Sequence, residues 1–149
     1  MNSWLFQGNP KFYLVRPALH HFSSISRPTT WLVNKHEKHI HSGDEVFFWE
    51  AGSEAGLVGR GTIQTDPAKL QLESEELTFV KTKEKFDGFR SRVRITIHSE
   101  FYYPRRELLR QPSLSKWYVI AHGQTGTNFR IPADVLLELR KVVQEPVNR

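Results

Sequence analysis

The stretch from Arg90 to Phe101 constrains the fold most, because apolar and polar side chains alternate along it. Val93, Ile95 and Ile97 fall on one face of an extended chain, and basic or hydroxyl side chains fall on the other. Pro104 ends the pattern, since proline cannot donate to a strand ladder. The alternation predicts a β-strand with one apolar face and one polar face.

Further short apolar runs predict more strands. Ser3–Phe6 is expected to be a buried strand, and Glu45–Trp49 another that follows a turn at Ser42–Asp44. Leu57–Ile63 is broken by glycines, which in a strand indicate a bulge or a close approach of backbones. Leu77–Val80 is expected to be a short edge strand.

Helical signals are fewer. Pro132–Gln144 is the clearest helix, with apolar residues at helical spacing. Pro10 is expected in the first turn of another helix behind an Asn9 cap, and Pro17 is expected to kink or end it. Lys116–Ala121 fits a helix or a strand equally well.

These elements predict an α+β fold, with a mainly antiparallel or barrel-like sheet. At 149 residues the chain is expected to form one domain, 1–149. Pro146–Arg149 after the last helix is expected to start a linker, so that the domain would be the N-terminal module of a longer protein.

Several classes of chemistry are excluded by what the sequence lacks. It contains no cysteine, which removes disulfides, thiolate nucleophiles and cysteine-ligated zinc, and which fits a reducing, cytoplasmic location. His36, His39 and His41 crowd together, but without further ligands a solvated loop is the better interpretation than a metal site. No Gly-x-Ser-x-Gly elbow, P-loop or membrane-length apolar run occurs. We therefore expect a binding domain with no cofactor and no membrane association.

Charge and aromatic content favour a nucleic-acid partner. The net charge is +5, and the arginines and lysines cluster at residues 81–94 and 105–110. A solvated charged surface explains the same residues about as well. Each aromatic side chain taken singly is expected in the core, whereas several together form a flat wall on which a base stacks.

Five tracts then resemble one family, the EVE domain of the PUA-like superfamily, which is related to YTH readers of methylated RNA. They are Trp4-Leu-Phe-Gln-Gly-Asn-Pro-Lys-x-Tyr13, Trp31-Leu-Val-Asn34, Ile40-x-Ser-Gly-Asp-x-Val-Phe-Phe-Trp-x-Ala-Gly52, Ala55-Gly-Leu-x-Gly-x-Gly61 and Gly126-Thr-Asn-Phe-x-Ile131. Each tract is weak alone, but their order and spacing cover nearly the whole chain. The resemblance implies a small curved, mainly antiparallel barrel with flanking helices.

The resemblance also implies a pocket for a modified base, between the loop after the first strand and the tryptophan of the second motif. Carried onto this sequence it names Gln7, Gly8, Asn9, Trp31, Leu32, Trp49, Ala51, Gly52 and Asn128. A structural cap before the last helix is an equally good role for Asn128.

Phosphate contacts are expected from basic residues on or near the alternating strand. The candidates are Lys11, Lys83, Lys85, Arg90, Arg92, Arg94, Arg105 and Arg106. Alternation places Arg90, Arg92 and Arg94 on one face, where solubilising an exposed sheet is an equally good explanation.

The function expected is recognition of a methylated base, 5-methylcytosine or N6-methyladenine, flipped out of duplex DNA. The family context implies the sensing domain of a modification-dependent restriction system, with a fused or associated nuclease or NTPase effector. A stand-alone reader of modified RNA is the alternative, and a nucleotide hydrolase is a third possibility that the missing catalytic constellation disfavours.

Overall fold

A long bent strand organises the fold. In the computed structural model, which describes residues 1–144, β6 spans Arg90–Pro104 and pairs with β2, β4 and β5. In chain order the elements are β1 (Ser3–Gly8), α1 (Val15–Ser24), β2 (Thr29–Leu32), β3 (Glu45–Glu50), β4 (Gly56–Ile63), β5 (Ala68–Leu70), α2 (Ser74–Leu77), the 3₁₀ turn η1 (Lys83–Lys85), β6, α3 (Arg105–Leu108), α4 (Pro112–Lys116), α5 (Tyr118–His122), β7 (Asn128–Arg130) and α6 (Ala133–Gln144).

The strands form one curled sheet in the order β2-β6-β4-β3-β1-β7. The pairing of β1 with β3 is parallel, and the other ladders are antiparallel. Glycines in β4 explain the curl, because a Cβ at Gly61 would lie 2.3 Å from the Thr96 carbonyl oxygen of β6. The register also shifts twice between β4 and β6. The close approach predicted for these glycines is therefore confirmed.

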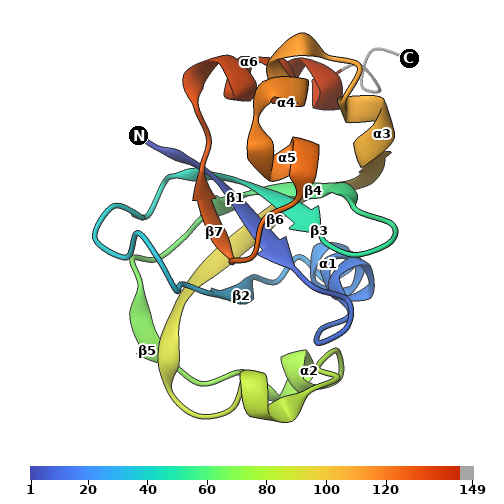
Figure 1. The fold of residues 1–149 in the computed structure, drawn as a ribbon. Coiled ribbons are helices and arrows are strands. Elements are labelled where there is room, and N and C mark those ends of the chain that lie inside the picture. Colours follow the sequence, from blue (N-terminus) through green and yellow to red (C-terminus); the bar gives the residue numbers. More distant parts are fainter. Residues whose placement is uncertain (145–149) are drawn as a thin grey trace.

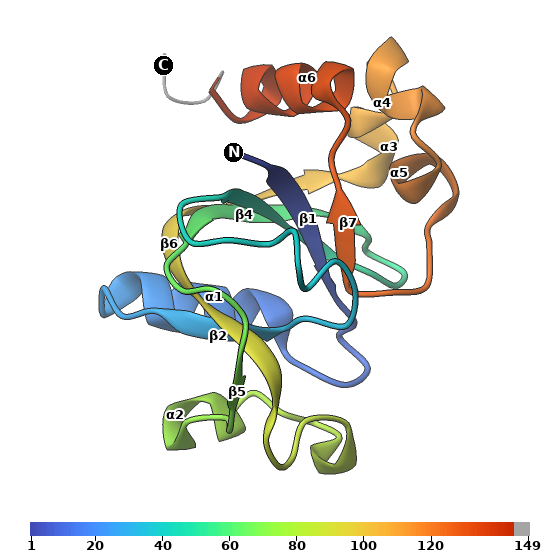
Figure 2. The same ribbon diagram turned by 90° about the vertical axis from the view of Figure 1, so that its left-hand side faces the viewer.

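The core is divided by the sheet into two clusters. Trp4 and Phe6 of β1 point into the first cluster together with residues of α1, β2 and β6. Leu5 points into the second, where Phe47 and Trp49 of β3 meet the C-terminal helices. Figure 1 and Figure 2 show α3–α6 gathered over one side of the sheet and α1 on the opposite side. The predicted α+β class, with a curved and mainly antiparallel sheet, is confirmed.

Three local predictions need correction. The helix expected from Pro10 begins at Val15, and Pro17 neither kinks nor ends it, because it lies in the first turn where no backbone N–H is needed. Leu77–Val80 is not a strand: Leu77 ends α2, and Val80 makes only a single bridge to Tyr13. The ambiguous stretch 116–121 falls mainly in the helix α5. The linker expected at 146–149 lies outside the described residues.

Candidate functional site

A cavity of about 940 Å³ opens beside the end of β1. Its walls are the loop after β1, strand β2, the segment between β5 and β6, and the loop between α5 and β7. The lining residues are Gln7, Gly8, Asn9, Phe12, Tyr13, Thr30, Trp31, Leu32, Asn34, Ala51, Leu72, Glu76, Glu84, Lys85, Phe86, Arg90, Arg92 and residues 122–127. The volume lies within the range of ~300–1,000 Å³ that ligand pockets usually span.

The last residue of β1 positions the tryptophan of β2. A Cβ on Gly8 would lie 2.6 Å from Val15 Cγ2 and 3.1 Å from Trp31 Cζ2, so only glycine lets the indole approach the strand this closely. Trp31 is 7% exposed, and its ring centroid lies 5.1 Å from that of Phe48. The indole is thus a packed core group whose edge reaches the cavity.

Aromatic rings continue from Trp31 along the cavity wall. Tyr13 meets Trp31 edge-on, with ring centroids 6.1 Å apart, and lies 5.6 Å from Phe86 on its other side. Phe12 is half-buried, and Lys85 Nζ lies 4.2 Å from its ring centroid, a cation–π contact. The wall therefore combines flat apolar surfaces with a cation at its rim.

Buried polar groups also belong to the cavity lining. Glu76 Oε2 accepts a hydrogen bond from the Thr30 hydroxyl at 2.6 Å, and burial raises the pKa of Glu76 above its ordinary value. Arg92 donates from Nε to the Leu70 carbonyl at 2.9 Å and from Nη2 to the Phe86 carbonyl. Burial lowers the pKa of Arg92. These bonds hold the segment between β5 and β6 against the sheet.

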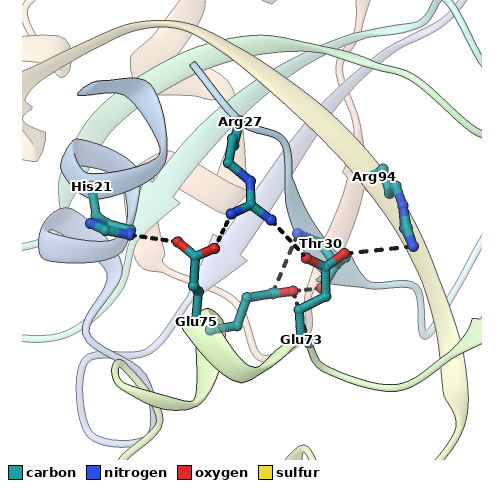
Figure 3. Close-up of polar contacts among 7 residues, drawn as sticks. His21, Arg27, Thr30, Glu73, Glu75 and Arg94 are labelled. Atoms are coloured by element: carbon teal, nitrogen blue, oxygen red, sulfur yellow. Dashed lines mark hydrogen bonds and ion pairs between the residues drawn. The ribbon is translucent and has the colours of Figure 1, made fainter. Parts of the chain in front are cut away.

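The same segment is fastened at its outer side by ion pairs (Figure 3). Glu75 of α2 lies between His21 and Arg27, with His21 Nε2 3.1 Å from its carboxylate. Glu73 lies 3.6 Å from Arg27 and 3.6 Å from Arg94 of β6. Ion pairs therefore add to the hydrogen bonds that hold this wall of the cavity.

The opposite wall is held by an amide. Gln7 Nε2 donates to the carbonyls of Gln124 and Gly126, at 2.8 Å in both cases. Asn9 uses its side-chain oxygen to accept from the Lys11 N–H at 2.9 Å, which folds the loop after β1 into a tight turn. Both amides therefore have fixed orientations at the cavity.

Most of the predicted pocket residues meet at this cavity. Gln7, Gly8, Asn9, Trp31, Leu32 and Ala51 line it. Trp49 does not, because alternation along β3 sends it into the second core cluster, where it is 1% exposed. Gly52 lies outside the lining, in a left-handed turn with φ 99°. Asn128 does not line the cavity: its buried side chain bonds to backbone groups of residues 32–35, which is neither the expected pocket role nor the expected cap before the last helix.

The predicted phosphate contacts are scattered. Lys85, Arg90 and Arg92 line the cavity, whereas Lys83, Arg94 and Arg106 do not. Lys11 Nζ lies 5.8 Å from the Phe12 ring, and a Cβ on Gly123 would lie 3.9 Å from Arg105 Nη1.

The expected exposed row of arginines on β6 is wrong for its central member. Arg92 is only 1% exposed, because the segment between β5 and β6 folds over that face of the strand.

Sequence reasoning missed several lining residues. Tyr13 ends the first EVE-like tract and so carried a signal that was not used, whereas Phe12 stands at the unspecified position of that tract. Glu76 and Phe86 lie in a polar, charged stretch and reach the cavity only through tertiary packing. Nothing in their local sequence marks them.

The histidine-rich loop gives no metal centre. His36 packs against Trp4 with ring centroids 5.3 Å apart, and burial, more than the neighbouring cations, lowers its pKa. Among residues 1–144 no three His, Cys, Asp or Glu side chains are grouped to hold a metal ion. Over the same part of the chain, no helix has the length and apolar character needed to cross a bilayer.

No family model matches the sequence, and no curated protein matches it. Solved structures do match over nearly the whole chain. Rpa0253 from Rhodopseudomonas palustris aligns with a TM-score of 0.65 at 13% identity, covering 95% of this chain and 92% of that one. Human THYN1, solved in complex with DNA containing 5-methylcytosine, aligns with a TM-score of 0.64 at 14% identity, covering 97% and 98%.

A third match is the YTH domain of Zygosaccharomyces rouxii MRB1, solved with N6-methyladenosine RNA. It aligns with a TM-score of 0.55 at 11% identity, covering 94% of this chain and 86% of that one. A further solved structure that matches this chain is the DUF55 domain of human thymocyte nuclear protein 1. The resemblance drawn from the sequence is thereby confirmed at the level of the fold: this chain has the PUA-like fold of the EVE and YTH domains.

Proposed function

We propose that this chain reads a methylated base in nucleic acid and takes that base into the cavity beside Trp31. The observation that carries the proposal is the combination of aromatic walls with a basic rim at the cavity. Two proteins of the same fold, THYN1 and the MRB1 YTH domain, were solved with methylated DNA and methylated RNA. We extend base flipping out of duplex DNA to this chain as part of the proposal.

A base that leaves the stack loses contacts which the cavity must replace. Stacking on an aromatic face is worth ~1–3 kcal/mol per base, and Phe12, with its ring half-buried at the cavity, offers such a face. Burying the added methyl group contributes only ~0.8 kcal/mol. Strong preference for the methylated base therefore also requires hydrogen bonds to its edge, for which Gln7 and Asn9 supply fixed amides at the cavity.

The phosphates of the nucleic acid on either side of the flipped base need cations to bind them. Lys85 and Arg90 lie at one wall of the cavity, and Arg105 lies next to Gly123 of the opposite wall. A strand that crosses the cavity would have its phosphates between these two groups. Such contacts give affinity with little sequence information.

The family context adds a role in a modification-dependent restriction system, with any nuclease in a separate effector domain. This part of the proposal rests on the resemblance of the sequence tracts alone. It is tested by expressing the full-length protein and asking whether it restricts a methylated plasmid but not the unmethylated one.

Direct binding measurements test the central proposal. Matched duplexes carrying cytosine, 5-methylcytosine, adenine or N6-methyladenine at one position are compared at fixed salt, because phosphate contacts make affinity salt-dependent. We expect one methylated duplex to bind about tenfold or more tightly than its unmethylated partner, about 1.4 kcal/mol. Equal affinity for all four duplexes overturns the proposal.

A matched pair of variants tests the place of binding. Trp31→Phe shortens the aromatic group at the cavity, and Trp117→Phe makes the same change at a tryptophan of the second core cluster with similar burial, 8% against 7%. We expect Trp31→Phe to lose most of the preference for the methylated duplex and Trp117→Phe to keep it. If both variants lose the preference to the same extent, the base does not bind in this cavity.

RNA is the second candidate partner, because the MRB1 YTH domain shares the fold and was solved with methylated RNA. The same measurements with single-stranded RNA bearing N6-methyladenosine distinguish the two. Tighter binding to the RNA than to either methylated duplex makes the chain an RNA reader.

A further inference from the structure

The side-chain amide of Gln7 has only one possible orientation. Its two partners, the carbonyls of Gln124 and Gly126, are pure acceptors, so the NH₂ group must face them. Both N–H bonds are then used within the protein. What Gln7 has left is Oε1, which accepts hydrogen bonds and donates none.

Oε1 is available to a ligand. No group among residues 1–144 donates to it, and it is not among the polar atoms of that part of the chain that are buried without a partner. Gln7 itself lines the cavity together with Gly8, where an added Cβ would lie 3.1 Å from Trp31 Cζ2. A base entering the cavity therefore meets an oxygen that accepts and cannot turn into a donor, because turning would break both bonds to the loop.

From this geometry we propose that Gln7 Oε1 accepts an N–H bond from the exocyclic amino group of the bound base. The inference rests on the proposed function and narrows it to amino-bearing methylated bases. Cytosine and adenine present an amino donor at this position, whereas thymine presents a carbonyl oxygen. Gln7 is then a specificity-determining residue, and an oxygen facing its Oε1 leaves both groups unpaired and repelling each other.

Thymine supplies a demanding comparison, because it carries the same 5-methyl group as 5-methylcytosine. The wild-type protein is measured against duplexes with 5-methylcytosine opposite guanine and thymine opposite guanine. A mispaired thymine leaves the stack more easily, so methyl burial and stacking alone would favour thymine. We expect 5-methylcytosine to bind about tenfold or more tightly, which is the usual effect of an unpaired polar group.

Adenine has a corresponding pair. N6-methyladenine keeps one N–H on its amino group, and N6,N6-dimethyladenine keeps none. We expect the dimethylated base to bind about tenfold or more weakly if adenine is the base that is read. The deciding pair is the one whose methylated base is preferred over its unmethylated form. If thymine binds as tightly as a preferred 5-methylcytosine, or N6,N6-dimethyladenine as tightly as a preferred N6-methyladenine, this inference is overturned and the proposed function stands. No preference for methylation in either series overturns both.

Variants separate reading of the base from support of the loop. Gln7→Met removes the acceptor and both bonds to the loop, and Gln64→Met is the control at a glutamine that bonds to Thr96 away from the cavity. If Gln7 only supports the loop, Gln7→Met weakens the binding of both ligands of a pair equally, and the ratio of their affinities is unchanged. We expect the ratio to fall towards one in Gln7→Met and to persist in Gln64→Met. Should Gln7→Met fail to fold, the comparison of ligands on the wild-type protein decides alone.

Discussion

The side-chain amide of Asn128 donates to the main-chain carbonyl of Leu32 across 3.0 Å and thereby joins the two ends of the sheet. Leu32 is the last residue of β2 and Asn128 the first of β7, and these strands stand at opposite ends of the strand order. The amide oxygen accepts from the Asn34 N–H at 2.8 Å, and Asn128 is 2% exposed. One buried side chain therefore closes the curled sheet beside the cavity that Leu32 lines.

Asn128→Asp should destabilise the fold, because a carboxylate cannot donate to the Leu32 carbonyl and becomes a buried charge facing it. We expect the free energy of unfolding in urea to fall by ~1–3 kcal/mol. Asn34→Asp is the control, since its exposed side-chain amide bonds to the Thr127 hydroxyl, and we expect it to change stability by about 0.5 kcal/mol or less. Equal losses in the two variants would show that Asn128 does not close the sheet.

Gly8→Ala should disturb both folding and binding. The new methyl group would lie 2.6 Å from Val15 Cγ2 and 3.1 Å from Trp31 Cζ2, so at least one of these side chains must move. Overpacking of this kind costs ~1–3 kcal/mol. We expect a lower midpoint of urea unfolding and a smaller affinity ratio between methylated and unmethylated duplexes. A variant with wild-type stability and an unchanged ratio contradicts the packing of Trp31 against β1.

The parts of the fold predicted from sequence are those in which a pattern repeats over many residues. Val93, Ile95 and Ile97 of β6 repeat every second residue and point into the core as expected. The helix α6 was likewise predicted from apolar spacing and proline boundaries. β5 and β7, with three residues each, form because β6 and β1 are already there to pair with them. Such elements have no periodicity of their own to read.

The candidate site was predicted where it follows β1 and β2 and missed where it depends on packing between distant segments. Gln7, Gly8 and Trp31 belong to contiguous tracts, and the structure brings them together. Alternation alone could not predict that Arg92 is covered, because the covering residues bond to it from Leu70 and Phe86. Trp49 was assigned to the pocket although its neighbour Phe48 is the residue of β3 that packs on Trp31. A shift of one residue along a strand exchanges the two faces of the sheet.

Glu76→Gln should change how stability depends on pH. Burial raises the pKa of Glu76 above 4.5, although hydrogen bonds from Thr30 oppose the shift. Between 4.5 and the folded-state pKa, the folded protein holds this proton more tightly than the unfolded chain. The free energy of unfolding therefore falls as the pH rises through that window, and then levels off. Glutamine does not titrate and removes this fall.

Urea unfolding measured between about pH 4 and pH 8 checks this expectation. The stability of Glu76→Gln relative to the wild type should increase as the pH rises above 4.5. Loss of the weak bond from the Glu73 N–H to the carboxylate shifts the variant by a constant amount and leaves the pH dependence unaffected. Parallel curves of unfolding free energy against pH for the wild type and Glu76→Gln would mean that Glu76 titrates alike in the folded and unfolded states.

Salt should loosen the cavity wall formed by α2. Arg27 contacts both Glu73 and Glu75, and its side chain is about half exposed, so mobile ions screen these pairs effectively. We expect the backbone amides of α2 to exchange hydrogen faster in about 0.5 M than in about 0.05 M NaCl, while the amides of β1 and β3 stay protected. In the Arg27→Gln variant, the amides of α2 should exchange fast already at low salt, and most of the salt dependence should be lost.

Arg16→Gln is the matched control for the salt prediction. Arg16 pairs with Glu50 and Glu54 instead, so its replacement should leave exchange in α2 unchanged. Two results would contradict this prediction: hydrogen exchange in α2 of the wild type that does not depend on salt, or exchange that changes equally in the two variants. Either result would mean that packing and buried hydrogen bonds hold this wall without help from its ion pairs.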